Sequence, residues 1–189
     1  LADGAQTQLR YTPQGQLLQV VNQSSGQRDI TRVQWQGSRA IAVHHPNETE
    51  HLQYDAKGRV TERILQRPNA QASGSTLVWH ERYSWTHQGK LQHHWLAEGG
   101  RLDYTWSHDG SRLLSLYWQD NTGARHKVID SMAGTPGYQY GNDLHLNTQL
   151  DARGRVHQLL LGQPAGTTLW AARLSYTQHN LVASEHHTY

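Results

Sequence analysis

The stretch "LQYDAKGRV" at residues 52–60 decides the fold. In it an aromatic residue, Tyr54, is followed by Asp55, two further residues and Gly58. An aspartate at the start of a turn accepts hydrogen bonds from backbone N–H groups two residues on, and a glycine at its end supplies a positive φ. The stretch therefore predicts a tight turn between two antiparallel strands.

The same pattern recurs along the chain. The interval from Gly37 to Gly58 is 21 residues, and so is the interval from Gly89 to Gly110. A fixed period of this length indicates a repeat architecture. The pattern is carried by Tyr11, Gly15, Leu17, Tyr54, Asp55, Gly58, Arg59, Val60, Trp85, Gly89, Leu91, Trp106, Gly110, Leu113, Asp151, Gly154, Arg155, Val156, Tyr176 and Asn180.

The residues around each turn alternate as in strands, and no segment shows a helical apolar stripe. We therefore expect an all-β fold of tandem antiparallel β-hairpins, each of about 21 residues, in one long curved or spiralling sheet. Residues 1–189 should form a single repeat domain of about eight or nine hairpins, with an insertion near 67–76 and an eroded repeat near 128–140. Uninterrupted alternation places Leu91, His93 and Trp95 on one face.

The motif Tyr-Asp-x-x-Gly-Arg-Val, repeated at this spacing, resembles the YD repeat of the Rhs (rearrangement hot spot) family. That family includes bacterial polymorphic toxins, the B and C subunits of insecticidal toxin complexes, and the teneurins. The resemblance implies hairpins that join edge to edge into a hollow shell enclosing a toxin domain. The chain would then be an open segment of shell wall in a secreted or cell-surface bacterial protein, with a structural, non-catalytic role.

Three departures from the family pattern shape this expectation. The sequence contains no Asp-Pro dipeptide of the family's self-cleaving motif, and no further domain is recognisable after the repeats. The hairpins are also too few to close a shell. We expect as partners the rest of a larger Rhs-type polypeptide or an enclosed toxin domain. The two edge strands of an open strip should either pair in a homodimer or be covered by residues 1–10 and 180–189.

The composition excludes several classes of function. The net charge is +2, and the 17 Lys and Arg residues are scattered, so we expect no nucleic-acid partner. No apolar run is long enough to span a membrane. The absence of Cys excludes disulfides, cysteine zinc sites and thiol catalysis. Only 35% of residues are hydrophobic, yet the chain has seven Trp and nine Tyr, which predicts a thin folded structure.

The 14 histidines raise the question of a metal site. Adjacent His pairs occur at residues 44–45, 93–94 and 186–187, but neighbouring residues of a strand point to opposite faces and cannot easily bind one ion. His80 begins a fragment of the helical His-Glu-x-x-His motif, but Ser84 occupies the position of its second His. We therefore predict no catalytic residue, no metal site and no cofactor.

A cluster of aromatic residues in the middle of the sequence has two interpretations. Cross-strand stacking of in-phase rings would hold the sheet together. Alternatively, a row of exposed rings would form a platform for glycans or a partner protein. The candidate platform residues are Trp79, Tyr83, Trp85, Trp95, Tyr104, Trp106 and Trp118.

Overall fold

The structure is a computed structural model that describes residues 5–24, 26–72, 74–132, 136–164 and 166–189. The described residues form sixteen strands and no helix, so none of them forms a helix able to cross a membrane. The strands are β1 (Gln6–Tyr11), β2 (Leu17–Ser24), β3 (Gln27–Gln36), β4 (Arg39–His44), β5 (Thr49–Tyr54), β6 (Val60–Pro68), β7 (Thr76–Trp85), β8 (Leu91–Trp95), β9 (Arg101–Trp106), β10 (Leu113–Gln119), β11 (Arg125–Ser131), β12 (Gly137–Tyr140), β13 (His145–Leu150), β14 (Val156–Gly162), β15 (Thr168–Tyr176) and β16 (Val182–Thr188).

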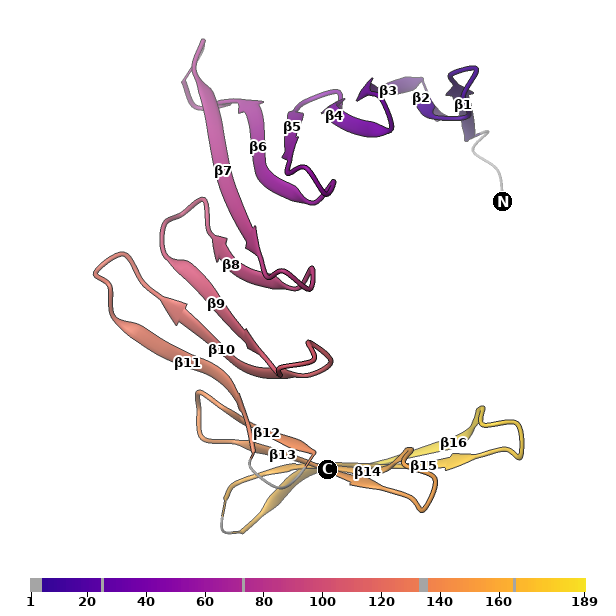
Figure 1. Cartoon of the computed structure of the whole chain (residues 1–189). Coiled ribbons are helices and arrows are strands. Elements are labelled where there is room, and N and C mark those ends of the chain that lie inside the picture. The colour runs from indigo at the N-terminus through magenta and orange to yellow at the C-terminus, as the bar shows by residue number, and fades with distance from the viewer. Residues whose placement is uncertain (1–4, 25, 73, 133–135, 165) are drawn as a thin grey trace. The chain divides into compact units, whose positions relative to one another are not determined.

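The predicted all-β class and the tandem hairpin arrangement are confirmed. The strands follow one another in a single sheet in the order of the sequence, from β1 to β16 (Figure 1). The pairings within the described part are antiparallel, as between β5 and β6. The sheet is open, because its order begins at β1 and ends at β16. Two compact units divide the chain, Leu1–Gly99 with β1–β8 (unit 1) and Gly100–Tyr189 with β9–β16 (unit 2).

The sheet has almost no core. Among the described residues the buried hydrophobic side chains are Val21, Ala42 and Ala172. The tertiary contacts between described elements join strands that are neighbours in the sheet. A chain with so little buried apolar surface depends on cross-strand side-chain pairs and on hydrogen bonds between adjacent hairpins.

Turns alternate between the two ends of the strands, because consecutive strands run in opposite directions. The predicted motif turns therefore lie together at one end in each unit. We call these turns the turn row. The turn row comprises residues 12–16, 37–38, 55–59 and 86–90 in unit 1 and residues 107–112, 151–155 and 177–181 in unit 2.

Two irregular regions were expected in the repeat. The segment 67–76 lies in the β6–β7 hairpin, where β6 has 9 residues and β7 has 10, and the connection runs from Asn69 to Ser75. The segment 128–140, where an eroded repeat is predicted, contains the connection between β11 and β12, in which Met132 N–H donates to the Gly137 carbonyl at 2.9 Å. Residues 133–135 of that connection lie outside the described residues.

A β-bulge follows the turns of the row, three residues after the glycine in the turn at 55–59. Tyr54 pairs with Val60, but the preceding residue Gln53 pairs with Glu62, which leaves Thr61 as an extra residue. A bulge of this kind bends the strand and increases its twist. The corresponding extra residues in the other turns of the row are Leu18, Ile41, Gln92, Leu114, His157 and Ala183.

Because of the bulge, Leu91 lies on a different face of the sheet from the one predicted. Leu91 pairs with Trp85, whereas His93 pairs with the neighbouring residue Ser84. Cross-strand partners share a face, and neighbours along a strand lie on opposite faces. The prediction that Leu91 and His93 share a face is therefore wrong, because the extra residue Gln92 shifts the alternation.

Candidate functional site: the turn row and the aromatic faces

Asp55 organises the best-preserved turn. Its Oδ1 accepts hydrogen bonds from the backbone N–H of Lys57 at 2.9 Å and of Arg59 at 3.0 Å. The N–H of Asp55 donates to the Arg59 carbonyl, and the N–H of Gly58 donates to the Asp55 carbonyl. Gly58 has φ 82°, a left-handed conformation that a side chain disfavours. Asp151 Oδ1 likewise accepts hydrogen bonds from the backbone N–H of Arg153 and Arg155. In the last turn of the row, Asn180 occupies the position of Gly58 and has φ 62°.

Arg59 connects its own turn to the next turn of the row. Its Nε and Nη2 lie 2.7 and 2.6 Å from Asp55 Oδ2, and its Nη1 donates to the Thr86 carbonyl at 2.9 Å. The guanidinium also lies over the Trp85 ring, 5.8 Å from its centroid. The aspartate therefore holds the arginine in place, and the arginine bridges two hairpins.

Arg155 repeats this arrangement in unit 2. It pairs with Asp151 Oδ2 at 2.6 Å, donates to Asn180 Oδ1 at 2.9 Å and lies 4.2 Å from the centroid of the Tyr176 ring. The Asp and Arg of the motif thus act as a structural pair between successive turns.

At four turns of the row, the aromatic residue before the turn forms a second link between hairpins. Tyr54 donates from its hydroxyl to the Ala40 carbonyl at 2.7 Å, a residue that follows the preceding turn of the row. Tryptophan forms the equivalent bond through its indole N–H. The other bonds of this type are Trp35 to Leu17 at 2.9 Å, Trp85 to Val60 at 2.7 Å and Tyr176 to Val156 at 2.7 Å. We call these the aromatic links.

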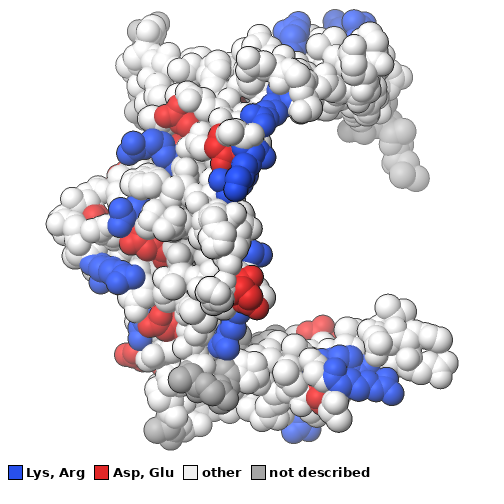
Figure 2. Space-filling view, in the orientation of Figure 1, with Lys and Arg blue, Asp and Glu red and all other residues white. Residues whose placement is uncertain are grey.

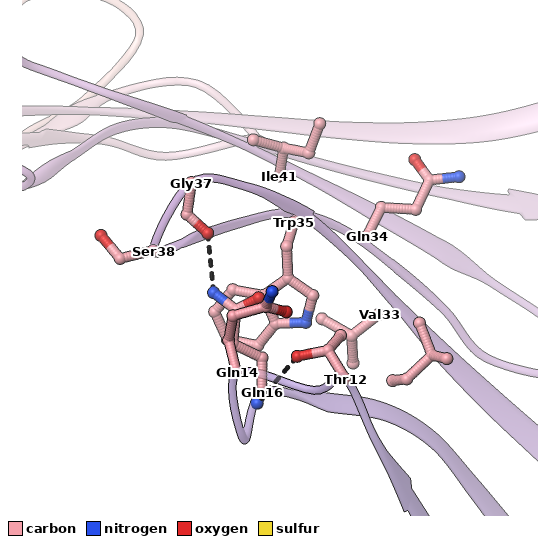
Figure 3. A pocket seen from close by; sticks show the side chains of 10 residues that line it. Thr12, Gln14, Gln16, Val33, Gln34, Trp35, Gly37, Ser38 and Ile41 are labelled. Atoms are coloured by element: carbon pink, nitrogen blue, oxygen red, sulfur yellow. Dashed lines mark hydrogen bonds between the residues drawn. The ribbon is translucent and has the colours of Figure 1, made fainter.

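The first two turns are joined by a glutamine in addition to the aromatic link from Trp35, and Figure 3 shows the contact. The Gln16 side chain donates from Nε2 to the Gly37 carbonyl at 2.6 Å, while the Gln16 N–H donates to Thr12 Oγ1 at 3.2 Å. The Trp35 ring and these turns line an open depression. Gln16 follows Gly15 as Arg59 follows Gly58, so the same position carries the forward contact with a different side chain.

The carboxylates of the turns are held in their charged form. Hydrogen bonds from the backbone and side chain of Arg59 lower the pKa of Asp55. The Arg155 side chain lowers the pKa of Asp151 to about 2. Bonds from Ser107 and Ser111 lower the pKa of Asp109 to about 2.

These pKa shifts predict acid sensitivity. A carboxylate whose pKa is lower in the folded state stabilises the fold above its unfolded pKa, near 4, and loses that contribution as the pH falls toward 2. The melting temperature should therefore fall steeply between pH 4 and pH 2. Asp151→Asn keeps an oxygen for the backbone N–H groups but removes the charge opposite Arg155. Thermal unfolding followed by circular dichroism should show a smaller drop with pH in this variant, and an unchanged drop would contradict the assignment.

The structure divides the candidate platform of unit 1 between two faces. Trp79, Tyr83 and Trp85 alternate along β7 and share a face. Trp95 pairs with Arg82, which lies on the opposite face from Tyr83. A ligand lying flat on one face could therefore contact only part of this set.

The rings of unit 1 contact histidine and arginine side chains. Tyr83 stacks on His94 with ring centroids 4.6 Å apart and an interplanar angle of 21°. Arg67 lies 4.8 Å from the centroid of the Trp79 ring. These cross-strand contacts stabilise the sheet in the way that stacked aromatic pairs do.

In unit 2 the platform residues share one face. Tyr104 pairs with Leu116 and Trp118 pairs with Leu102, which places Trp106 on that face as well. Burial raises the pKa of the Tyr104 hydroxyl. Of the seven platform residues only Trp118 is exposed, at 40%, and its ring lies 5.1 Å from that of His126.

A polar cluster crosses four strands of unit 1 and was not predicted. Arg63 pairs with Glu50 at 2.5 Å and with Glu81 at 3.5 Å. The Tyr83 hydroxyl donates to Glu81 at 2.6 Å, and His94 Nε2 lies 3.7 Å from the same carboxylate. Burial and the bond to Glu81 raise the pKa of Tyr83. Burial alone would raise the pKa of Glu81, but Tyr83, His94 and Arg63 together lower it.

A further turn of the same design lies at the other end of the strands. Asp120 Oδ1 accepts from the N–H of Thr122 and of Ala124, both at 2.9 Å, and Gly123 has φ 87°. The Thr122 hydroxyl and His126 lower the pKa of Asp120 to about 2. The sequence Asp-Asn-Thr-Gly at 120–123 has the Asp and Gly that indicate this turn. It does not match the whole motif, because Gln119 occupies the position of the aromatic residue.

The histidines of the described residues are dispersed among carboxylates and rings. No group of three or more metal-ligating side chains occurs in the part of the chain that the structure describes. His80 lies 2.5 Å from Glu62, and His187 lies 3.1 Å from Glu185. Figure 2 shows acidic and basic side chains interspersed over the visible surface.

The fold of this chain is similar to that of known proteins, although its sequence is not. No family model and no curated protein matches the sequence. Among solved structures, the chain is similar to the Tc holotoxin pore of Photorhabdus luminescens, with a TM-score of 0.69 and 16% identity over 98% of this chain and 10% of that one. It is also similar to TcdB2-TccC3 without the hypervariable C-terminal region, with a TM-score of 0.70, 16% identity and the same coverage. The fold is that of a Tc toxin segment.

The predicted resemblance to the B and C subunits of insecticidal toxin complexes is thereby confirmed for the fold. The chain spans about one tenth of the length of the Tc toxin chains it matches. The Tc likeness covers 98% of this chain, so both units contribute to it.

Proposed function

We propose that the chain is a non-catalytic structural segment of the YD/Rhs type, which forms part of the β-shell wall or scaffold of a secreted or cell-surface, toxin-related bacterial protein. The observation that carries this proposal is the pair of links between successive turns. The Arg59 bridge joins the turns at 55–59 and 86–90, and four aromatic links join neighbouring hairpins in the two units. These links are formed by residues of the repeated motif. The side chains of the motif therefore have a structural role in holding the sheet together.

The thinness of the sheet supports the same role. A single layer with three buried hydrophobic side chains among the described residues offers two faces and little interior. An enzyme requires a concave site with convergent polar groups. A wall requires only a continuous, hydrogen-bonded surface. In the proposed role one face would meet an enclosed polypeptide, such as a toxin domain, and the rest of a larger Rhs-type protein would complete the shell.

Site-specific photocrosslinking tests this role. Leu77 and Val78 are neighbours on β7 and point to opposite faces. A photoreactive amino acid placed at each position in turn, in the protein isolated from its source, should crosslink an enclosed polypeptide from one position and not from the other. Equal crosslinking from both faces, or from neither, would contradict the wall role.

The alternative is a binding module that uses an aromatic-rich face for a glycan or a partner protein. Trp118 favours it, because this ring is exposed and lies beside His126. Stacking of a sugar on Trp118 would change tryptophan fluorescence on a glycan array, and Trp118→Ala would abolish the change. The matched control is Val128→Ala, an exposed residue of the adjacent strand β11. An array without any response excludes the glycan form of this alternative.

A further inference from the structure

Two arginines and a glutamine form a row across one face of β1–β3, the indigo part of the ribbon in Figure 1. Arg10 pairs with Gln19, and Gln19 pairs with Arg32. Cross-strand partners share a face, so the three side chains lie side by side. Residues 1–10 and 180–189 were expected to cover the sheet edges, but their described parts are strands of the sheet, and β1 contributes Arg10 to this row.

Arg28 extends the positive charge of this face. It lies four residues before Arg32 on β3 and therefore points to the same side. We call the face of β1–β3 that carries Arg10, Arg28 and Arg32 the basic face. Asp29 is the one acidic residue of these three strands, and it lies on the opposite face because it is adjacent to Arg28. The other polar side chains of the basic face include Gln6, Gln8, Gln19 and Gln23.

The charges of the basic face are available to a ligand. Arg10, Arg28 and Arg32 are all exposed. Within the part of the chain that the structure describes, none of the three guanidinium groups pairs with a carboxylate. The basic residues are scattered in the sequence, and the registers of the three strands bring them together.

The position of Arg32 recurs in the repeat with a different neighbour. Arg32 and Arg82 each stand three residues before the aromatic donor of a link. Arg82 pairs with Glu62 and lies 5.5 Å from the centroid of the Trp95 ring, whereas Arg32 pairs with Gln19. The fold therefore accepts either a carboxylate or a neutral amide opposite this arginine, and β1–β3 carry the amide.

The chemistry of the basic face favours an acidic polysaccharide. Guanidinium groups form paired hydrogen bonds with the oxygens of sulfate and carboxylate groups. Glutamine amides can both donate to and accept from hydroxyl groups, which sugars carry in number. Arg28 and Arg32 are about 13 Å apart along β3, so an extended polyanion suits the face better than a single small anion.

Two other classes of anionic partner fit this face less well. Proteins that bind single-stranded nucleic acid stack its bases on aromatic rings, but Tyr11 and Trp35 lie on the opposite face from Arg10 and Arg32. Proteins that lie on anionic membranes insert apolar side chains into the lipid. On the basic face, Val21 is buried, and its partner on β3 is half-buried.

We propose that the basic face binds an acidic polysaccharide. Arg10, Arg28 and Arg32 each pair with an acidic group of the polymer, and the glutamines bond to its hydroxyl groups. The site lies in unit 1 and depends on charge, so it differs from the stacking of a sugar on Trp118 in unit 2. It also does not depend on the role of the chain as a shell wall.

Titration calorimetry of the protein with heparin, a sulfated polysaccharide, measures this binding. The affinity should fall as salt is added, and neutral dextran should give no signal. Gln19→Glu places a carboxylate between Arg10 and Arg32, as Glu62 does beside Arg82, and should raise the dissociation constant about tenfold. The melting temperature should stay the same, because the repeat already carries glutamate at the equivalent position 62.

Arg153→Gln is the charge-matched control. Arg153 is exposed in a turn of unit 2, and its replacement changes the net charge by the same amount as Gln19→Glu. This variant should bind heparin like the parent. Arg32→Gln should weaken binding and reduce the slope of log Kd against log salt by about one.

Three results would overturn the proposal. The first is a protein that does not bind heparin. The second is an equal loss of affinity in Arg153→Gln and Gln19→Glu, which would show attraction to the overall charge and not to the basic face. The third is binding of duplex DNA as tight as that of heparin, which would show that the face does not select a polysaccharide.

Discussion

Trp85→Ala should lower the free energy of unfolding by about 2–3 kcal/mol, which is less than the about 3–5 kcal/mol lost at buried aromatic sites, because this ring is half-buried. The variant loses the bond from the indole to the Val60 carbonyl and the surface on which Arg59 lies. Because contacts join only neighbouring hairpins, the loss should be local. Hydrogen exchange should accelerate in β6–β8 and remain unchanged in β13–β16.

Two further variants separate the contributions of Trp85. Trp85→Phe keeps an aromatic ring under Arg59 but removes the donor, so it should cost about 1 kcal/mol, the net contribution of one hydrogen bond. Val78→Ala alters an exposed side chain on the opposite face of the same strand and should change stability by less than about 0.5 kcal/mol. A Phe variant as stable as the parent would show that the aromatic link adds nothing to ring packing.

Gly141→Ala should also destabilise the protein, by about 2–3 kcal/mol, because the added methyl group would clash with the backbone of the neighbouring strand. A Cβ at this position would lie 2.1 Å from the Lys127 carbonyl oxygen, which belongs to the backbone of β11 and cannot rotate away. The Gly141 N–H also donates to the Val128 carbonyl, so the turn cannot move outward without losing a bond. Chemical denaturation followed by tryptophan fluorescence measures the change.

Gly166→Ala is the matched control for Gly141→Ala. Gly166 lies in the next turn at the same end of the strands, and a Cβ there meets no atom within 4 Å. This variant should be as stable as the parent or slightly more stable, because alanine reduces the conformational freedom of the unfolded chain. Similar losses in both variants would indicate that the turn conformation, rather than the contact with Lys127, limits the site.

The repeated turns were accessible to sequence reasoning because their signal is local. Asp55 and Gly58 lie within four residues of each other, and both act inside one turn. The roles of Arg59 and Tyr54 were not accessible, because each acts on the neighbouring hairpin, 27 residues away for the Arg59 bond to Thr86. The length of the intervening connections varies along the chain, so a period alone does not identify which residues meet.

The bulges and the polar cluster show a second limit. An extra residue such as Gln92 has no distinctive sequence, yet it decides which face carries every later side chain of the strand. The contacts of Glu81 with Arg63 and His94 require the registers of three adjacent strands at once. An error of one residue in any of these registers would place the three side chains on different faces.

The aromatic links also bear on how such a chain can change in length. Each link joins an aromatic side chain to a backbone carbonyl, and a carbonyl is present whatever residue follows the preceding turn, as with Leu17, Ala40 and Val60. If one whole repeat is deleted, the aromatic donor of the next repeat therefore meets the backbone carbonyl of the repeat before the deletion, which is an acceptor of the same kind. Deletion of part of a repeat removes a donor or reverses a strand. Gain and loss of sequence should thus be tolerated in whole hairpins, and the sheet can be lengthened or shortened by recombination between its own repeats.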